Sequence, residues 1–172
     1  MPVNELMGIL PSAIILGILV AIALFIALSR GWADNNDDQM RRAVQIAAIT
    51  VILQAVHFTE ELLTGLEERL PSLFGLDAMS LAVFVLFNVA WLVIWSVSVW
   101  GLRTKHRAAL FPLWFLALGC VFNGIAHPLL SAMVGGYFPG LATSPVVGLA
   151  GILLLRSLLQ ITQTVNSRLR AA

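Results

Sequence analysis

Five long apolar runs divide the chain, and each is long enough to cross a membrane as a helix. They predict helices over residues 6–29, 42–66, 78–102, 108–134 and 145–166. A helix needs about 20 apolar residues to span the hydrocarbon of a bilayer, and the loops between these runs are short. The pattern therefore predicts an all-α polytopic membrane protein in which residues 1–172 form a single five-helix transmembrane domain.

Polar side chains interrupt the second run at helical spacing. One face carries a row at steps of four, three, four, three and four residues, which consists of Thr50, Gln54, His57, Glu61, Thr64 and Glu68, with Glu60 beside it. Each ionisable side chain inside a membrane costs at least ~2.5 kcal/mol on insertion scales. A cluster of three such groups therefore indicates a functional site that faces other helices or a cavity.

A second polar row lies on the fourth predicted helix. It consists of Cys120, Asn123, His127 and Ser131, at steps of three, four and four residues. At 1.5 Å per residue, His57 and Asn123 both lie ~21 Å from the cytoplasmic end of their helix, and Glu60, Glu61 and His127 lie ~26 Å from it. The matching depths predict one site between the second and fourth helices, in the outer half of the bilayer.

The distribution of positive charge predicts the orientation of the chain. With five spans, the 30–42 loop, the 103–107 connector and the C-terminal tail lie on the same side of the membrane. These segments carry eight Lys and Arg residues, whereas the loops on the other side carry Arg69 alone. Cytoplasmic loops carry this excess. We therefore expect the N-terminus outside and the C-terminus in the cytoplasm.

Composition limits the class of protein and of partner. Hydrophobic residues make up 59% of the chain and charged residues 11%, with a formal net charge of +1. Soluble domains contain about 45–50% apolar residues, and nucleic-acid binders carry a basic patch that is missing from this sequence. The partners that we expect are the lipid bilayer and a lipid-like substrate, and the sequence leaves the oligomeric state open.

The residue types in the two polar rows suit a metal. A His₂Glu set can hold one Zn or Fe ion, and it would consist of His57, His127 and one carboxylate of the Glu60/Glu61 pair. Of this pair, Glu61 is the residue that lies in the polar row. The other carboxylate would then be free to act as a base on a metal-activated water. Asn123, one turn from His127, is placed to orient a ligand or to donate to an oxyanion.

Further residues are expected around this centre. Gln54, Asn88 and Trp91 are candidates for the wall of a substrate pocket, although Trp91 also suits simple packing or an interfacial anchor. Arg156, near the midplane of the fifth predicted helix, is expected either as a counter-ion to the carboxylates or as a group that binds a substrate phosphate.

Three other interpretations use the same residues. Without a metal, the adjacent carboxylates could share a proton and act as an acid–base pair in an isomerase-like lipid enzyme. A carrier for metal ions or small solutes would use the same ligands, but it needs a polar path to both sides of the membrane. Finally, His57 with Glu61 and His127 with Asn123 could simply be hydrogen-bonded packing pairs.

Three fragments together resemble a known family. His57–Glu61 fits the pattern HxxEE, Asn123–His127 fits NxxxH, and Pro139–Thr143 fits PGxxT. In this order they are similar to the HXXEE family of small bacterial membrane proteins. The resemblance implies a helical integral membrane domain with an expected enzymatic role but no assigned activity. The positions that it carries over are His57, Glu60, Glu61, Asn123, His127, Pro139, Gly140 and Thr143.

A weaker similarity concerns the isomerase alternative. Asn88 and Trp91 form an Asn-x-x-Trp fragment that resembles one in the emopamil-binding sterol isomerases, although here it lies on the third predicted helix. The leading hypothesis from the sequence is an intramembrane, metal-dependent, hydrolase-like enzyme. The uncharged loop over residues 135–143 is expected to cap its site.

Overall fold

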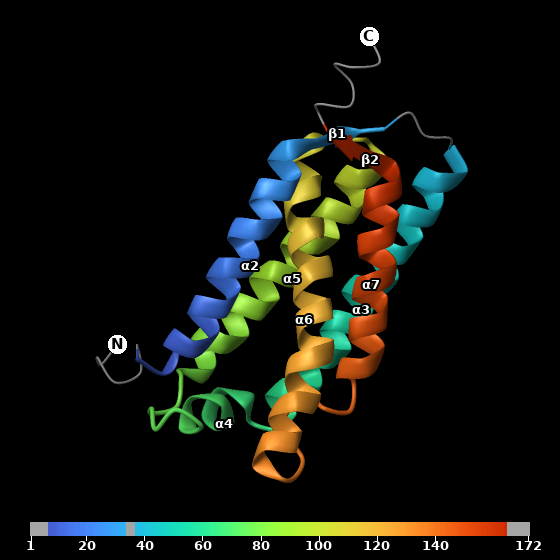
Figure 1. Ribbon diagram of the computed structural model, residues 1–172. Helices are drawn as coiled ribbons and strands as arrows, with labels where there is room; N and C mark the ends of the chain where they lie inside the picture. Colours follow the sequence, from blue (N-terminus) through green and yellow to red (C-terminus); the bar gives the residue numbers. More distant parts are fainter. Residues whose placement is uncertain (1–6, 34–36, 165–172) are drawn as a thin grey trace.

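The computed structural model of the chain describes residues 7–33 and 37–164. Within these residues, five helices are long and apolar enough to cross a membrane. They are α2 (Leu10–Ser29), α3 (Asp37–Leu63), α5 (Leu81–Arg103), α6 (Leu110–Val134) and α7 (Ser144–Ile161) (Figure 1). The prediction of five helices that could span a membrane is thereby confirmed. Residue 6 of the first predicted helix, residues 165–166 of the fifth and the tail arginines Arg168 and Arg170 lie outside the described residues.

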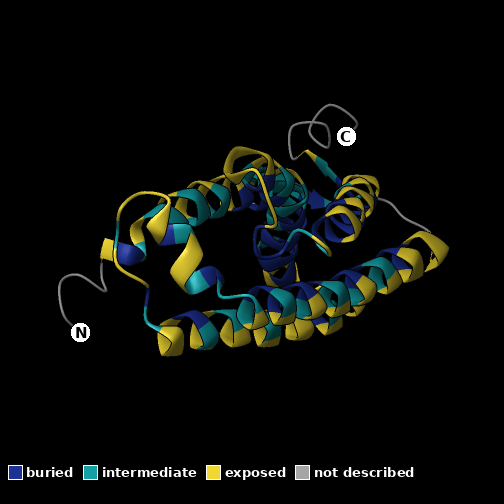
Figure 2. Cartoon of the chain, turned by 90° about the horizontal axis from the view of Figure 1, so that it is seen from below, coloured by how far each residue is buried: buried dark blue, intermediate teal, exposed yellow. Residues whose placement is uncertain are grey.

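The five helices form a bundle in which α6 is central. Helix α6 packs against α7, α2 and α5, and α3 packs against α7 and α5. Buried residues gather in the centre of the bundle and exposed residues cover its outer faces (Figure 2). Many of the exposed residues are large and apolar, such as Phe25 at 71% and Leu86 at 71%. Such an outer surface suits contact with lipid tails and not with water.

The tightest helix contact joins α6 and α7 through small residues. A Cβ atom added to Gly124 would lie 2.6 Å from the Cα atom of Gly148, and one added to Gly151 would lie 2.7 Å from the Cβ atom of Cys120. Small residues let helix backbones approach closely where the hydrophobic effect cannot drive association. This contact fixes α7, and the loop that precedes it, against the side of α6 that carries His127.

The ends of the second predicted helix differ from the sequence-based boundaries. Helix α3 begins at Asp37, five residues earlier than predicted, and ends at Leu63. Gly65 then adopts a left-handed conformation (φ +75°), which starts the short helix α4 (Leu66–Ser72). Helix α4 lies across the end of the bundle and was not predicted (Figure 1). Its Glu67 carbonyl accepts a hydrogen bond from the Met79 amide, just before α5.

The opposite end of the bundle is closed by a short β-ribbon that the all-α prediction missed. Strand β1 (Arg30–Trp32) pairs antiparallel with β2 (Thr162–Thr164), so the fifth helix ends at Ile161 and not near residue 166. The Arg30 guanidinium donates hydrogen bonds to the Thr162 hydroxyl and carbonyl oxygens, at 2.9 and 2.7 Å. The short 3₁₀ helix η1 (Arg107–Ala109) connects α5 with α6 at the same end. The ribbon joins the end of α2 to the end of α7.

Candidate functional site

Three ligand-type side chains meet between α3 and α6. Oε1 of Glu61 lies 3.3 Å from Nε2 of His57 and 3.2 Å from Nε2 of His127. One ligand atom from each residue lies within 4.8 Å of the other two. The exposed fractions are 0% for His57, 6% for Glu61 and 5% for His127. The two polar rows therefore meet at one depth of the bundle, as their spacing along the two helices predicted.

The outer nitrogens of both imidazoles are hydrogen-bonded to the loop between α6 and α7. Nδ1 of His127 lies 2.5 Å from the Pro139 carbonyl oxygen, which can only accept, so Nδ1 carries the proton. Nδ1 of His57 lies 2.6 Å from Oγ1 of Thr143. The Thr143 hydroxyl donates its single hydrogen to Glu60, so it accepts from His57. In the neutral imidazoles, both Nε2 atoms therefore carry a lone pair.

This arrangement leaves three acceptors facing one another. Nε2 of His57 is buried and has no hydrogen-bond partner among the described residues. Two nitrogen lone pairs and a carboxylate oxygen repel unless a cation, either a proton or a metal ion, lies among them. Ligand atoms at 2.0–2.1 Å around a tetrahedral zinc are about 3.3–3.4 Å apart. The two distances to Glu61 fit that value, so the residues present fit a metal ion.

Glu60 points to the loop and not to the two histidines. Its carboxylate accepts four hydrogen bonds: Oε1 from the Tyr137 hydroxyl at 2.5 Å and the Ala142 amide at 2.9 Å, and Oε2 from the Thr143 amide at 2.8 Å and the Thr143 hydroxyl at 2.5 Å. The expectation that the second carboxylate stays free to act as a base does not fit these contacts. Glu60 instead holds the loop, and through Thr143 it orients His57.

The surroundings of Glu60 suit a negative charge. Ala142 and Thr143 immediately precede α7, and an anion at the N-terminal end of a helix is stabilised by the unpaired amides and the helix dipole. Tyr137 lies in the loop outside the membrane-spanning helices. Burial and the hydrogen bond to the Glu60 carboxylate raise the pKa of its phenol. Tyr137 therefore stays protonated and remains a donor to Glu60 at neutral pH.

Gly140 brings the loop backbone against both imidazole rings. It has a left-handed φ of +85°. A Cβ atom there would lie 2.6 Å from Nδ1 and Cε1 of His127 and 3.0 Å from Cε1 of His57. The two rings are themselves in edge-to-face contact, with centroids 4.8 Å apart. Only glycine fits this position, and the loop caps the site as the absence of charge in residues 135–143 predicted.

A cavity of about 680 Å³, lined mostly by apolar side chains, reaches the cluster. Glu61 and His127 line it, together with four of the other predicted residues, Gln54, Asn88, Trp91 and Asn123. The Asn88 amide donates to the Phe84 carbonyl oxygen at 2.9 Å. The Asn123 side chain has no hydrogen-bond partner within the described part of the chain. Its amide is therefore available to a molecule in the cavity.

Gln54 lies farther along α3 and also lines the cavity. Its Oε1 atom accepts a hydrogen bond from the buried thiol of Cys120 at 3.3 Å. Trp91 packs against Phe115, with ring centroids 4.5 Å apart. Trp91 therefore both packs against α6 and lines the cavity.

The prediction for Arg156 was wrong. This residue is on the exposed side of α7 and forms no ion pair with any described residue, so it is neither a counter-ion to Glu61 nor a part of the cavity. Its neighbour Ser157 faces the core instead. Arg156 lies five residues from the end of α7, about 7.5 Å along the axis. From there a long side chain can reach the membrane surface.

Two contributions to the site were missed in the sequence. Tyr137 donates to Glu60, and the backbone amides of Ala142 and Thr143 donate beside it. Tyr137 is the single tyrosine of the chain and lies in its uncharged loop, which is a signal that could have identified it. Backbone amides leave no signal in a sequence.

Comparison with curated proteins gave no match, and comparison with solved structures gave none. A family model described as "Protein of unknown function with HXXEE motif" matches residues 28–154. The match includes α3, α4, α5, α6 and the loop that holds the histidines, and therefore every residue of the site described above. By this match over most of its length, the chain belongs to the HXXEE family.

Proposed function

We propose that this protein is an intramembrane metalloenzyme that hydrolyses a lipid-like, amphipathic substrate. The observation that carries the proposal is the direction of the two imidazoles. Both Nδ1–H groups are bound to the loop, so both Nε2 lone pairs converge on one oxygen of Glu61. Outer hydrogen bonds of this kind orient metal-ligating histidines in proteins.

His57, Glu61 and His127 would hold one Zn²⁺ or Fe²⁺ ion, with a position left for water or substrate. Such an ion supplies Lewis-acid activation of water and of a carbonyl or phosphoryl group. Because Glu60 is engaged by the loop, Glu61 is the carboxylate near enough to accept a proton at the site. The free amide of Asn123, one turn from His127, would donate to the oxygen that gains negative charge.

The lining of the cavity supports a lipid-like substrate. It is largely apolar and lies among membrane-spanning helices, where lipids are the abundant small molecules. A carrier would need polar groups along a path to both sides of the membrane, and the part of this cavity that is lined by Leu16, Trp95 and Phe115 contains no charged side chain. The charge distribution supports an orientation with α4 and the capping loop outside and β1 and β2 on the cytoplasmic side of a bacterial inner membrane.

Elemental analysis of protein purified without a His-tag or nickel column tests the metal. We expect about one equivalent of Zn or Fe in the wild type and a loss of most of it in His57→Ala, His127→Ala and Glu61→Gln, because each removes one of three ligands. His106→Ala is the matched control, since that histidine is exposed in the connector before η1. Wild-type protein with well under one equivalent after supplementation would exclude the metal, and a metal-free acid–base site of Glu61 with the two histidines would replace it.

Hydrolysis is tested separately. Wild-type protein and His127→Ala are each incubated in nanodiscs made from total bacterial lipid, and the lipids are compared by mass spectrometry over time. We expect one lipid class to decrease in the wild-type sample while a product heavier by water, or a pair of cleavage products, increases. Identical lipid profiles for the two proteins would contradict an enzyme that acts on membrane lipids.

A further inference from the structure

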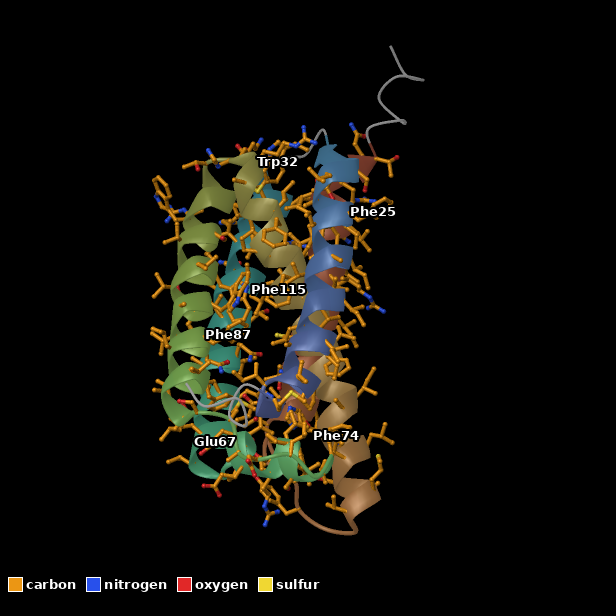
Figure 3. The ribbon with its side chains drawn as sticks, turned by 90° about the vertical axis from the view of Figure 1, so that its left-hand side faces the viewer. Phe25, Trp32, Glu67, Phe74, Phe87 and Phe115 are labelled. Atoms are coloured by element: carbon orange, nitrogen blue, oxygen red, sulfur yellow. The ribbon has the colours of Figure 1, made fainter. Side chains whose placement is uncertain are left out.

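The cavity lies between α2 and α5, with α6 behind it. Phe87 of α5 and Phe115 of α6 are seen between these two helices in Figure 3, and both line the cavity. Helix α2 contributes Leu16 and Val20 to the opposite wall. On the outside, Val83 and Phe87 are 37% and 41% exposed although they line the cavity. The cavity is therefore open between α2 and α5, on a face that the lipid tails contact.

The length of the cavity compares with that of a lipid tail. From the cluster toward the middle of the bundle, the lining along α6 extends from His127 to Phe115, which is 12 residues and therefore about 18 Å of helix. On the other side of the cluster the lining continues to Leu129 and Leu130. One leaflet of a bilayer contributes about 15 Å of hydrocarbon, half of the core. The volume of about 680 Å³ is within the range of pockets that enclose one small molecule. A single extended hydrocarbon chain fits these dimensions.

Between His127 and Phe115 the lining changes from polar to apolar. It begins with Glu61, His127 and the free amide of Asn123, while apolar side chains such as Leu66, Leu70 and Leu130 line the cavity on the α4 side of the cluster. Gln54 and Asn88, farther along, are already engaged by Cys120 and by the Phe84 carbonyl. Beyond them the wall is formed by apolar side chains: Leu16, Leu19, Val20, Trp91, Trp95 and Phe115. The cavity therefore matches an amphiphile with its polar group at the cluster and its chain directed away from it.

We propose that the cavity binds one hydrocarbon chain of a membrane lipid from the leaflet on the α4 side, which enters sideways between α2 and α5. The cluster lies near the end of the bundle that α4 crosses, and the chain would run from there toward the middle of the membrane. A lipid in that leaflet already has this direction, so it can enter without turning over. The inference rests on the proposed function only for the reaction of the polar group, and chain binding itself needs no metal.

Two glycines offer a way to block the cavity without damaging the fold. A Cβ atom added to Gly17 of α2 or to Gly119 of α6 meets no atom within 4 Å, and both residues line the cavity. Glycine is a poor helix former, so Gly119→Leu also favours the helix. Its side chain would occupy the space about 12 Å from His127 along α6, where the tail is expected. Ala90→Leu is the matched control, because Ala90 is exposed on α5 and does not line the cavity.

The test uses phosphatidylethanolamine with a photoreactive diazirine in one acyl chain, placed either near the ester or near the chain end. The protein is reconstituted in vesicles that contain this lipid, irradiated, digested and analysed by mass spectrometry. We expect the ester-proximal probe to label residues near Asn123 and the chain-end probe to label residues near Trp95 and Phe115. Gly119→Leu should reduce the second labelling roughly tenfold, since displacing two methylene groups already accounts for that factor, while Ala90→Leu leaves it unchanged.

Labelling confined to outward residues such as Phe25 and Leu86, or the reverse order of the two probes, would overturn the proposal. So would equal labelling of wild type and Gly119→Leu. The same measurement on His127→Ala separates this proposal from the metalloenzyme: chain labelling should persist there. Bound metal without chain labelling would support the metalloenzyme and contradict the lipid-chain site. Chain labelling without bound metal would support the lipid-chain site and contradict the metalloenzyme.

Discussion

Replacing Glu60 by Gln should loosen the loop that orients the two histidines. The carboxylate accepts hydrogen bonds from four donors, two at each oxygen. A glutamine keeps one carbonyl oxygen, which can still accept from the Thr143 amide and hydroxyl. Its NH₂ group then faces the Tyr137 hydroxyl, which can rotate to accept, and the Ala142 amide, which cannot. One backbone hydrogen bond is lost, and the others no longer have a charged acceptor.

The size of the effect follows from these contacts. Hydrogen bonds to charged groups contribute about 1.5–3 kcal/mol and neutral ones about 0.5–1.5 kcal/mol, and the Ala142 contact is exposed, which favours the lower values. We expect loop opening to become easier by about 2 kcal/mol, which is a factor of about 30 in the opening equilibrium. Hydrogen exchange of the Ala142 and Thr143 amides in nanodiscs measures this factor directly.

The control is Glu68→Gln, which removes an exposed carboxylate of α4 in the same way. It should leave exchange in the loop unchanged. Metal content should fall in Glu60→Gln by less than in Glu61→Gln, because the three ligands remain and only their orientation is loosened. If the two amides exchange in Glu60→Gln as slowly as in the wild type, the carboxylate does not hold the loop and our assignment of its role is wrong.

Four further predictions follow from the same structure. Gly140→Ala should lose metal, because its Cβ would overlap the His127 ring by about 1 Å and metal ligands tolerate only ~0.2 Å; full occupancy would refute the close contact. In labelling of intact cells, Arg103→Cys should react only from the cytoplasm and Leu141→Cys only from outside, and the reverse would overturn the orientation. Arg156→Leu should leave metal content unchanged, and a loss would show that it acts at the site. Gly148→Val should lower the thermal stability in detergent by several degrees, since it separates α6 from α7; an unchanged melting temperature would contradict that contact.

The sequence predicted the spans and the meeting of the polar rows because both depend on distances along a single helix. Thr50, Gln54, His57 and Glu61 are all buried, as their helical spacing required. His127 meets them because equal depth in two neighbouring helices leaves few other arrangements. The same reasoning failed for Arg156. Nearly every face of α7 is apolar, so the sequence pattern does not predict which face of this helix points to the core. In the structure, Gly148 and Gly151 pack on α6, and Arg156 therefore faces outward.

Other features depend on contacts between distant parts of the chain. Glu60 and Glu61 are neighbours on α3 and point about 100° apart, so their roles depend on which of them faces α6 and which faces the loop. The β-ribbon joins Arg30–Trp32 to Thr162–Thr164, more than 120 residues away. Neither segment contains enough of an alternating pattern to be predicted as a strand by itself.

The attachment of α2 at both of its ends has a consequence for kinetics. At one end Gly8 lies so close to the Asp77 carbonyl oxygen that there is no room for a Cβ atom, and at the other end Arg30 and β1 are bound to β2. A lipid chain must therefore pass a helix that can bend only between two fixed points. We expect long residence times for a bound lipid, with release and not bond cleavage as the slow step of turnover. Cutting the ribbon by truncation before Thr162 would free one end, and the protein would then exchange its lipid faster while holding it less tightly.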